Sequence, residues 1–335
     1  MGTYSGIKGY MIQSLASDPS PTASVAGQMW YNSTSNTWKI AVAGSGAWST
    51  GGVMNSVGRE DASGAGTQTA AIVIAGYHGP PGAGQMGNTE EYNGTAWTEV
   101  NDITTVRYGL DSTGLQTALI AGGGGAVNAG ETYDGTSWTD VGAMSRSGPS
   151  WGQGGVSGTM TAAVFGFGAG GGGPTGNIVE SFDGSCFAAD TAGITARSTL
   201  WGFGGAAAAT AAIVVGGQWT AADAAYTEEW NGTAWAEVAD LNNPRGIGNA
   251  ASGTTTAGLI AGGYQGGPIG KTETWDGTSW SEVGDLQNAR GNCNGTPAGT
   301  SSEAACYAGS PNLTMGKLCE EFDSPVYAIE TVTTS

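Results

Sequence analysis

Residues 271–290 carry the sequence KTETWDGTSWSEVGDLQNAR, and this stretch decides the fold. Its first part predicts a short strand that ends at Trp275, and its second part predicts another strand that passes through Trp280. Asp276-Gly277 lies between them and is a strong signal for a two-residue hairpin turn. Both residues of such a turn take a positive φ, which glycine adopts without strain. The stretch therefore predicts a β-hairpin, followed by a loop that leads to an arginine.

The same pattern occurs six times in the chain. Clear copies are EEYNGTAWTEV, ETYDGTSWTDV and EEWNGTAWAEV, and degenerate copies are ESFDGSCFAAD and EEFDSPVYAIE. The aromatic residue before the turn recurs at intervals of 41 to 49 residues. Each unit also contains a short apolar run that ends in glycine, such as TALIAGG (117–123) and AGLIAGG (257–263), which predicts a buried strand. With a weaker Gly/Ser-rich strand before this run, each unit has four predicted strands, which is typical of a propeller blade.

The repeated unit resembles the kelch repeat. The buried strand closes on a glycine pair such as Gly262-Gly263, an aromatic residue and a tryptophan follow, and an arginine comes after a Leu-containing loop. The resemblance covers residues 48–335 and implies an all-β fold, a six-bladed kelch-like β-propeller. The third unit departs from the pattern because Phe187 replaces the tryptophan, and the sixth because Ser324-Pro325 replaces Gly-Thr. The turn is also shorter than the hairpin loop common in that family.

Two segments qualify as the strand that closes the propeller. A ring of blades must pair its last blade with its first, because otherwise two strand edges remain unpaired. The segment WSTGGVMNSVGR (48–59) copies the outer strand and loop of a repeat, and VYAIETVTTS (326–335) follows the sixth hairpin turn. We expect the C-terminal segment to complete the sixth blade, with the strand at Trp48 beside it. The expected domains are then an N-terminal docking segment (1–47) and the propeller (48–335).

Residues 1–47 stand outside the repeat. The phrase GQMWYNSTSNTWKIAVAG (27–44) predicts a small β-hairpin. With SLASDP (14–19), it resembles the start of many bacteriophage structural proteins, where similar text leads into a repetitive β domain. No signal peptide is indicated, because no apolar h-region precedes Asp18. The resemblance implies a virion protein assembled in the host cytoplasm, whose residues 1–47 bind other virion proteins or a second copy of the chain.

Composition limits the classes of partner. The formal net charge is −18, with only ten Lys and Arg residues, which argues against nucleic acid and against anionic membrane surfaces. The longest apolar run, residues 206–215, is too short to span a bilayer, so we expect no membrane insertion. Strong acidity keeps a glycine-rich surface soluble.

Six of the ten cations are arginines, one per repeat, and a glutamate recurs two residues before each hairpin aromatic. Such rings of opposite charge predict buried guanidinium–carboxylate pairs that stabilise the blades. The alternative is an arginine-lined channel that binds an anionic sugar. The arginines are Arg59, Arg107, Arg146, Arg197, Arg245 and Arg290, and the glutamates are Glu90, Glu131, Glu180, Glu228, Glu273 and Glu320.

No residue pattern indicates catalysis, a metal or a cofactor. His78 is the only histidine, which excludes His-based zinc clusters and weakens any His-dependent triad. The Asx residues of the turns are explained by turn chemistry rather than by calcium ligation. Three of the four cysteines fall in the sixth repeat, where a disulfide stays open as an alternative to buried thiols. We therefore expect a protein that is not an enzyme.

The connections between the second and third strands of each repeat vary in length and sequence, and they would share one face of the propeller. Variable loops on a rigid scaffold are where recognition usually lies. Tyr77, His78, Trp219 and Tyr264 lie in or beside these loops and are candidate ligand-binding residues for a host-surface glycan or protein. The leading hypothesis is a phage tail fibre, spike or other appendage component. A carbohydrate-active propeller enzyme and an intracellular protein-interaction kelch protein are the alternatives.

Overall fold

The computed structural model describes residues 13–20, 26–79, 84–125, 127–145, 155–167, 177–195, 201–203, 209–219, 222–246, 250–312, 314–324 and 326–332. The chain divides into two compact units, one of residues Ala47–Asp323 and the other of Met1–Gly46 with Ser324–Ser335. In the described ranges the protein is all-β, and its one helical element is a single 3-10 turn, η2 (Met315–Lys317).

The larger unit contains six antiparallel sheets, five of four strands and one of three, which we number in chain order. Their strands are listed here in order from first to last. Sheet 1 has β5 (Ser63–Thr67), β6 (Ala70–His78), β7 (Gly84–Tyr92) and β8 (Trp97–Val100); sheet 2 has β9 (Asp111–Leu115), β10 (Ala118–Gly122), β11 (Ala129–Tyr133) and β12 (Trp138–Ala143); sheet 3 has β13 (Gly155–Thr159), β14 (Ala162–Gly166), β15 (Val179–Phe182) and β16 (Phe187–Ala189). Sheet 4 has β17 (Trp201–Phe203), β18 (Ala212–Val215), β21 (Thr227–Trp230) and β22 (Trp235–Val238); sheet 5 has β23 (Ala250–Thr254), β24 (Ala257–Ala261), β25 (Thr272–Trp275) and β26 (Trp280–Glu282); sheet 6 has β27 (Glu303–Tyr307), β28 (Cys319–Asp323) and β4 (Ala47–Thr50). A two-stranded ribbon, β19 (Gln218–Trp219) and β20 (Ala222–Asp223), forms part of the connection that leads from the second to the third strand of sheet 4.

The hairpin predicted from residues 271–290 is present, but its turn differs from the expectation. Trp275 pairs with Trp280, so four residues connect the strands rather than two. The Asp276 carboxylate accepts the backbone N–H groups of Thr278 and Ser279, both at 2.8 Å. Of the connecting residues only Gly277 has a positive φ, at 90°. The Asp276 side chain therefore closes this connection as an Asx turn, in place of the expected two-residue turn.

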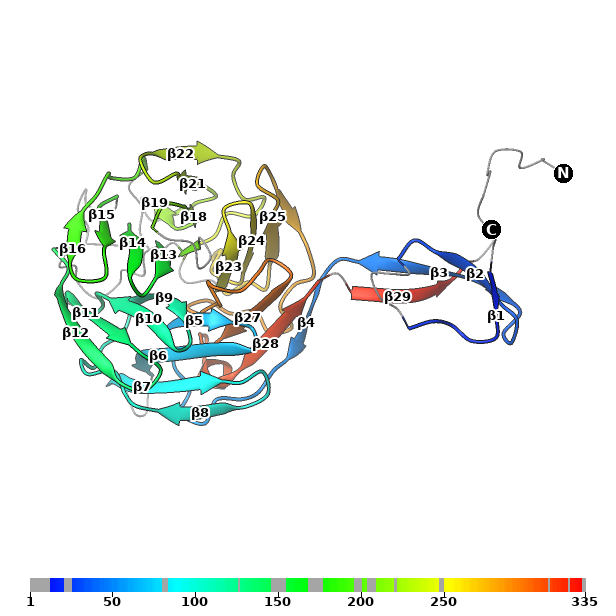
Figure 1. The fold of residues 1–335 in the computed structure, drawn as a ribbon, viewed down its shortest axis with the longest axis horizontal. Helices are drawn as coiled ribbons and strands as arrows, with labels where there is room; N and C mark the ends of the chain where they lie inside the picture. The colour runs from blue at the N-terminus through cyan, green and yellow to red at the C-terminus, as the bar shows by residue number, and fades with distance from the viewer. Residues whose placement is uncertain are drawn as a thin grey trace. The chain divides into compact units, whose positions relative to one another are not determined.

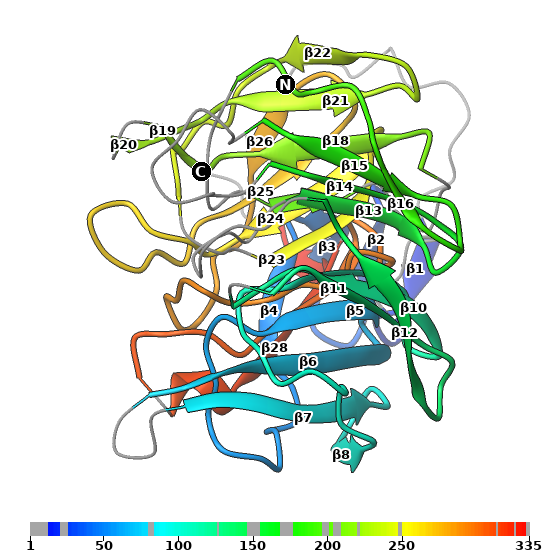
Figure 2. The same cartoon turned by 90° about the vertical axis from the view of Figure 1, so that its left-hand side faces the viewer.

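The first strands of the six sheets lie against one another in cyclic order. β5 contacts β9, the series continues through β13, β17, β23 and β27, and β27 contacts β5 again. Figure 1 shows these sheets around a common centre, with the fourth strands β8, β12, β16 and β22 at the periphery. Figure 2 shows the strands of sheet 1 following one another from the interior to the edge of the unit. This arrangement is compatible with a β-propeller.

The expected closing strand was wrong. β4, rather than the C-terminal segment, completes sheet 6, with Trp48 paired to Phe322. The Trp48 indole is buried, lies 5.2 Å from the Phe322 ring and donates to the Thr272 hydroxyl at 2.9 Å. β29 (Val326–Thr331) pairs instead with β3 (Thr37–Gly44), so residues 324–335 belong to the smaller unit and not to the larger one.

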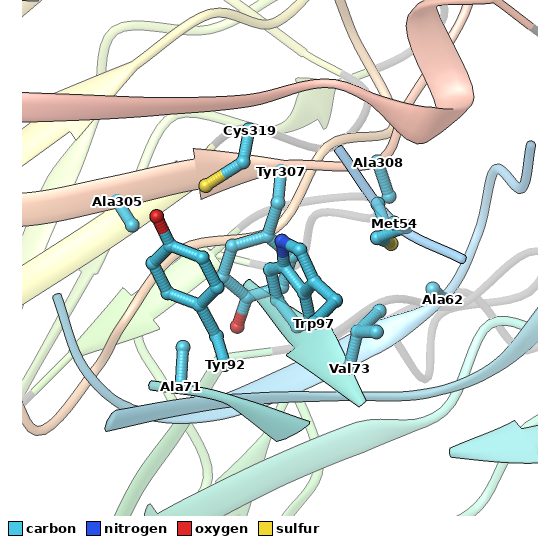
Figure 3. Packing of buried hydrophobic residues seen from close by; sticks show 10 residues of the cluster. All are labelled: Met54, Ala62, Ala71, Val73, Tyr92, Trp97, Ala305, Tyr307, Ala308 and Cys319. Atoms are coloured by element: carbon cyan, nitrogen blue, oxygen red, sulfur yellow. The ribbon is translucent and has the colours of Figure 1, made fainter. Parts of the chain in front are cut away.

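Aromatic side chains fill the seam between sheet 6 and sheet 1. The Trp97 ring lies 4.9 Å from Tyr92 and 5.2 Å from Tyr307, and all three are buried (Figure 3). The Tyr307 hydroxyl donates to the carbonyl oxygen of Gly295 at 2.6 Å and also lies 3.1 Å from that of Ile72. These contacts join the last repeat to the first through one cluster of buried side chains.

We expect Gly64→Ala to lower the free energy of unfolding by about 1–3 kcal/mol, because a Cβ there would overpack this seam. That atom would lie 2.0 Å from the buried Tyr307 hydroxyl oxygen. Gly267→Ala is the matched control, since no atom lies within 4 Å of a Cβ at that position. Urea unfolding of both variants measures the difference in the free energy of unfolding. Equal midpoints would show that the side chains at the seam accommodate the added Cβ without a loss of stability.

The four cysteines carry free thiols, so the structure contains no disulfide in the sixth repeat. Cys293, Cys306 and Cys319 are buried, whereas Cys186 is exposed in the turn of the third hairpin. Cys293 and Cys306 pack in the apolar cluster between sheets 5 and 6, as small core residues do.

The smaller unit is one four-stranded sheet. Its order is β1 (Gln13–Leu15), β2 (Met29–Asn32), β3 and β29, with β1 parallel to β2. Trp30 is buried, and its indole donates to the Asp18 carboxylate at 3.0 Å. On β2 and β3, Met29 and Trp38 remain 47% and 41% exposed. This sheet thus leaves large apolar side chains uncovered by the described residues.

Candidate functional site

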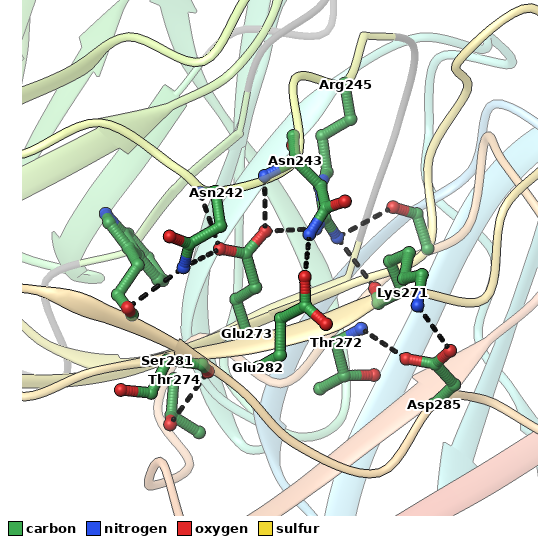
Figure 4. Close-up of polar contacts among 12 residues, drawn as sticks. Asn242, Asn243, Arg245, Lys271, Thr272, Glu273, Thr274, Ser281, Glu282 and Asp285 are labelled. Carbon is green, nitrogen blue, oxygen red and sulfur yellow. Dashed lines mark hydrogen bonds and ion pairs between the residues drawn. The ribbon is translucent and has the colours of Figure 1, made fainter.

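The repeated arginine and glutamate meet in a buried ion pair. In sheet 5 (Figure 4), Arg245 Nη2 lies 2.5 Å from Glu273 Oε1, and its Nη1 donates to the Lys271 carbonyl at 2.7 Å. Glu273 also accepts the backbone N–H groups of Asn242 and Asn243 at 2.8 and 3.2 Å. Burial lowers the pKa of Arg245, and the Glu273 charge opposes that effect. The pair therefore fastens the incoming loop to the third strand.

The same contact occurs in three further sheets. Its members are Arg59 with Glu90 at 2.8 Å, Arg107 with Glu131 at 3.4 Å, and Arg290 with Glu320, all with buried side chains. Arg146 and Arg197 lie outside the described residues. Glu180 and Glu228 are buried as well, and each accepts a backbone N–H from the loop before its sheet. The four described guanidinium groups are thus enclosed in the scaffold.

The Asx side chains of the hairpin turns also accept hydrogen bonds from nearby backbone N–H groups. Backbone N–H groups lower the pKa of Asp134 and Asp276, and the Ser185 hydroxyl and further backbone N–H groups lower that of Asp183 to about 2. Across the described ranges, no three His, Cys, Asp or Glu side chains come together in a way that could hold a metal ion. The turn carboxylates are therefore used by the turns themselves.

Two of the predicted ligand-binding residues lie at the end of β6. The Tyr77 ring packs edge-on against Tyr108 at 5.5 Å, and the Tyr77 backbone exchanges hydrogen bonds of 2.7 and 3.0 Å with Glu60. His78 pairs with Gly84 across the hairpin and is half-buried. The structure thus places Tyr77 beside the Tyr108 ring and the Glu60 backbone, which come from two different loops.

The other two candidates lie on different sheets. Tyr264 pairs through its backbone with Gly246 and Pro268, and its hydroxyl lies 3.3 Å from that of Ser310. The backbone of Trp219 belongs to β19, whereas its side chain lies outside the described part. No ring contact joins Tyr77 to Tyr264 among the residues that the structure describes. Among the described side chains, Tyr77 and Tyr264 therefore have separate partners and share no ring contact.

Sequence reasoning missed the acidic pair Glu60-Asp61, which follows the first repeat's arginine. Burial raises the pKa of Glu60, although a hydrogen bond with Asn292 opposes it. Burial and the Glu60 charge raise the pKa of Asp61 to about 7. Asp61 also has a positive φ of 51°. The signal was available, since the corresponding positions after Arg107 and Arg290 carry Tyr-Gly and Gly-Asn.

Glu60, Asp61, Tyr77, Tyr108 and Asn292 form what we call the loop-face cluster. It combines aromatic rings with carboxyl and amide groups, which is the chemistry of a polar ligand site with apolar platforms. Perturbed carboxyl pKa values are a feature of functional sites, although structural carboxylates show them too. The cluster is the candidate site of this protein.

We expect the raised pKa of Asp61 to reduce stability as the pH increases. The folded protein keeps a proton on Asp61 that the unfolded chain releases near the ordinary pKa of 3.8. The stability that comes from this bound proton is therefore fully present below pH 3.8 and is lost as the pH rises to about 7. Asp61→Asn removes it, and asparagine tolerates the positive φ. The difference in unfolding free energy between wild type and variant, measured by urea at about pH 4 and about pH 8, should therefore fall with pH. A constant difference would contradict the shift.

Comparison of the chain with protein-family models finds no match, and comparison with curated proteins finds none either. Among the described residues, the only helical turn is far too short to cross a bilayer.

Proposed function

We propose that this chain is a non-enzymatic virion protein of a bacteriophage appendage, with a six-bladed kelch-like β-propeller that presents its loop face to a host surface. The cyclic contacts of the six innermost strands support six blades, with β4 as the outer strand of the three-stranded sheet 6. The buried Arg–Glu pairs support a scaffold role for the repeated charges. The repeats therefore supply rigidity, and the loops supply whatever is specific.

One observation carries the proposal, namely that the features suited to display lie in the larger unit and those suited to attachment lie in the smaller unit. The larger unit buries its repeated charges and keeps the loop-face cluster at the ends of its strands. The smaller unit pairs β29 with β3 in one sheet and exposes Met29 and Trp38. A single sheet of this size needs a second layer to cover its apolar side chains. Attachment through the smaller unit would supply that layer.

Mass spectrometry of purified virions tests the class of protein directly, because a structural component must be present in washed particles. Binding of the fluorescently labelled larger unit to host cells tests the display role. Binding that Tyr108→Ala weakens and Gly267→Ala leaves unchanged would support the loop-face cluster. A chain absent from washed virions would refute the proposal.

Truncation separates attachment from folding. We expect residues 47–323 to form a soluble folded monomer, whereas the full chain assembles, because the shorter piece keeps β4 and loses the sheet with exposed apolar residues. Light scattering measures the assembly state, and circular dichroism the fold. A piece that starts at residue 51 lacks β4 and should not fold cooperatively. Normal assembly of residues 47–323 would contradict the attachment role.

A carbohydrate-active enzyme is the second candidate, and Asp61 is the observation that favours it. A carboxyl group with a pKa of about 7 is partly protonated at neutral pH, as a general acid must be. Its neighbour Glu60 could serve as the second carboxylate. Incubation with host-type glycans and product analysis decides between binding and hydrolysis. If the wild type forms a glycan product and Asp61→Asn does not, a catalytic function would replace the binding proposal.

A further inference from the structure

The tripeptide Asn-Gly-Thr occurs three times in the chain, at residues 93–95, 231–233 and 294–296. An asparagine before a glycine is open to attack on its side-chain amide by the next backbone nitrogen, because glycine has no Cβ to obstruct the approach. Since the tripeptide is the same in all three places, differences in reactivity among the copies must come from the fold. The structure places two copies in exposed turns and the third in the core.

The first copy lies in the connection between β7 and β8. Asn93 is exposed, and its Oδ1 accepts the backbone N–H groups of Thr95 and Ala96 at 3.0 and 2.9 Å. Gly94 has a φ of 85°, and its N–H donates to no acceptor among the described residues. The amide carbonyl of Asn93 is therefore polarised by two donors, while the neighbouring N–H is accessible to a base in solvent.

The two donors lie where negative charge would develop during an attack on the amide. If the Gly94 nitrogen lost its proton and bonded to Asn93 Cγ, Oδ1 would become an oxyanion, and donors aimed at such an atom lower the barrier. The Cγ–Nδ2 bond would then break, ammonia would leave, and a five-membered succinimide would remain. Water could reopen this ring at Cγ or at the main-chain carbonyl, and the same donors favour Cγ, which gives aspartate rather than isoaspartate. In total, one amide and one water molecule give a carboxylate and an ammonium ion.

The second copy, between β21 and β22, has the same geometry. Asn231 is exposed, and its Oδ1 accepts the backbone N–H groups of Thr233 and Ala234, both at 3.0 Å. Gly232 has a φ of 89°, and its N–H likewise donates to no acceptor in the described part of the chain. Both asparagine turns thus present the same groups to solvent.

Two other repeats already have the product of this reaction at the equivalent position. Asp134 and Asp276 accept the corresponding pair of backbone N–H groups at 2.7 to 2.9 Å, and the glycines that follow them both have a φ of 90°. These N–H groups lower the pKa of both carboxyl groups, so they favour the charged form. An aspartate therefore fits the turn with the same backbone, and its charge strengthens the two hydrogen bonds.

The third copy lies in surroundings that oppose the reaction. Asn294 is 1% exposed, and its backbone exchanges hydrogen bonds of 2.9 and 3.0 Å with that of Tyr307. A Cβ at Gly295 would lie 2.4 Å from the backbone nitrogen of Ala251, so the chain is packed closely at this point. Formation of a succinimide here would require the backbone to move and solvent to enter. The fold should therefore protect this amide.

We propose that Asn93 and Asn231 are sites of spontaneous deamidation, which converts each asparagine turn into the aspartate turn of the other repeats and spares Asn294. The modification adds two negative charges to the larger unit. These charges lie at the ends of the sheets opposite to the loops that join the second and third strands, because consecutive connections of an antiparallel sheet alternate between its ends. The proposal does not depend on the loop-face cluster or on the proposed function.

The test is incubation of the full chain at mildly alkaline pH, once folded and once in concentrated urea, with peptide mapping by tandem mass spectrometry. In the folded chain we expect Asn93 and Asn231 to convert to aspartate while Asn294 keeps its amide, and in urea we expect all three to convert. On ion exchange, the incubated folded protein should elute with the double variant Asn93→Asp/Asn231→Asp. The matched control is Asn93→Ser/Asn231→Ser, which should gain no charge, because serine keeps an oxygen acceptor for the turn but has no amide.

Unchanged Asn93 and Asn231 in the folded chain, under conditions that convert all three sites in urea, would overturn the proposal, because the turns would then protect the amides. Equal conversion of Asn294 in the folded chain would also overturn it, since the reaction would then follow unfolding. Isoaspartate in the same proportion in the folded chain and in urea would contradict the conversion of one turn into the other. Isoaspartate adds a methylene group to the backbone and removes the side-chain acceptor of the turn.

Discussion

Arg245→Ala should lower the free energy of unfolding by about 3–5 kcal/mol, because removal of one partner leaves the other charge buried and unpaired. Both side chains of the Arg245–Glu273 pair are fully enclosed. The variant also removes the donor to the Lys271 carbonyl oxygen at 2.7 Å. Equilibrium urea unfolding, followed by tryptophan fluorescence, measures the loss. We expect binding at the loop-face cluster to persist in whatever fraction of the variant remains folded.

Lys271 provides the matched control within the same sheet. Its ammonium lies 3.2 Å from the Asp285 carboxylate, but the two side chains are 42% and 43% exposed. Such a pair is worth about 0–1 kcal/mol, so Lys271→Ala should change stability little. Equal effects of the two variants would contradict the buried-pair role. Unchanged stability with lost ligand binding in Arg245→Ala would instead favour an arginine-lined channel.

Trp48→Ala should cost a similar amount, about 3–5 kcal/mol, because it removes a large buried aromatic group. Trp48 packs on Phe322 and donates to the Thr272 hydroxyl, so it links β4 both to its own sheet and to sheet 5. Trp48→Phe should restore part of the loss, since a six-membered aromatic ring remains although the five-membered ring of the indole and its N–H are missing. Thermal unfolding of the two variants measures how much stability the remaining ring recovers.

The control is Trp38 of the smaller unit, which is 41% exposed. Trp38→Ala should leave the unfolding of the larger unit within about 0.5 kcal/mol of the wild type. Ile329→Ala, in β29, should likewise spare that unit. A large loss with Ile329→Ala and none with Trp48→Ala would mean that the C-terminal strand completes sheet 6 after all.

Local chemistry explains which parts of the fold were predictable. The Asx-Gly hairpins and the buried strands follow from short patterns, and the all-β fold with four-stranded sheets is confirmed. The turn length was wrong, because the Asp276 side chain caps two N–H groups and makes a longer connection stable. A short motif identifies the turn residues but does not determine how many of them lie outside the paired strands.

Long-range pairing explains what could not be predicted. The segments at Trp48 and Tyr327 both resemble a fourth strand, and local sequence does not choose between them. The choice depends on β3, which takes β29 as its partner and leaves β4 to sheet 6. The acidic members of the loop-face cluster were missed, whereas Tyr77 was predicted. Glu60-Asp61 does not belong to the repeated pattern, because this acidic pair occurs after only one arginine.

The order of strands in the larger unit is tested most directly by a cryo-electron microscopy map of the full chain. We expect six radially arranged sheets, with the density of β4 next to β28 as the outer strand of the last sheet and the Trp48 indole in contact with Phe322 and Thr272. A map with seven sheets, with an open gap between β27 and β5, or with the C-terminal strand in the place of β4 would contradict this structure.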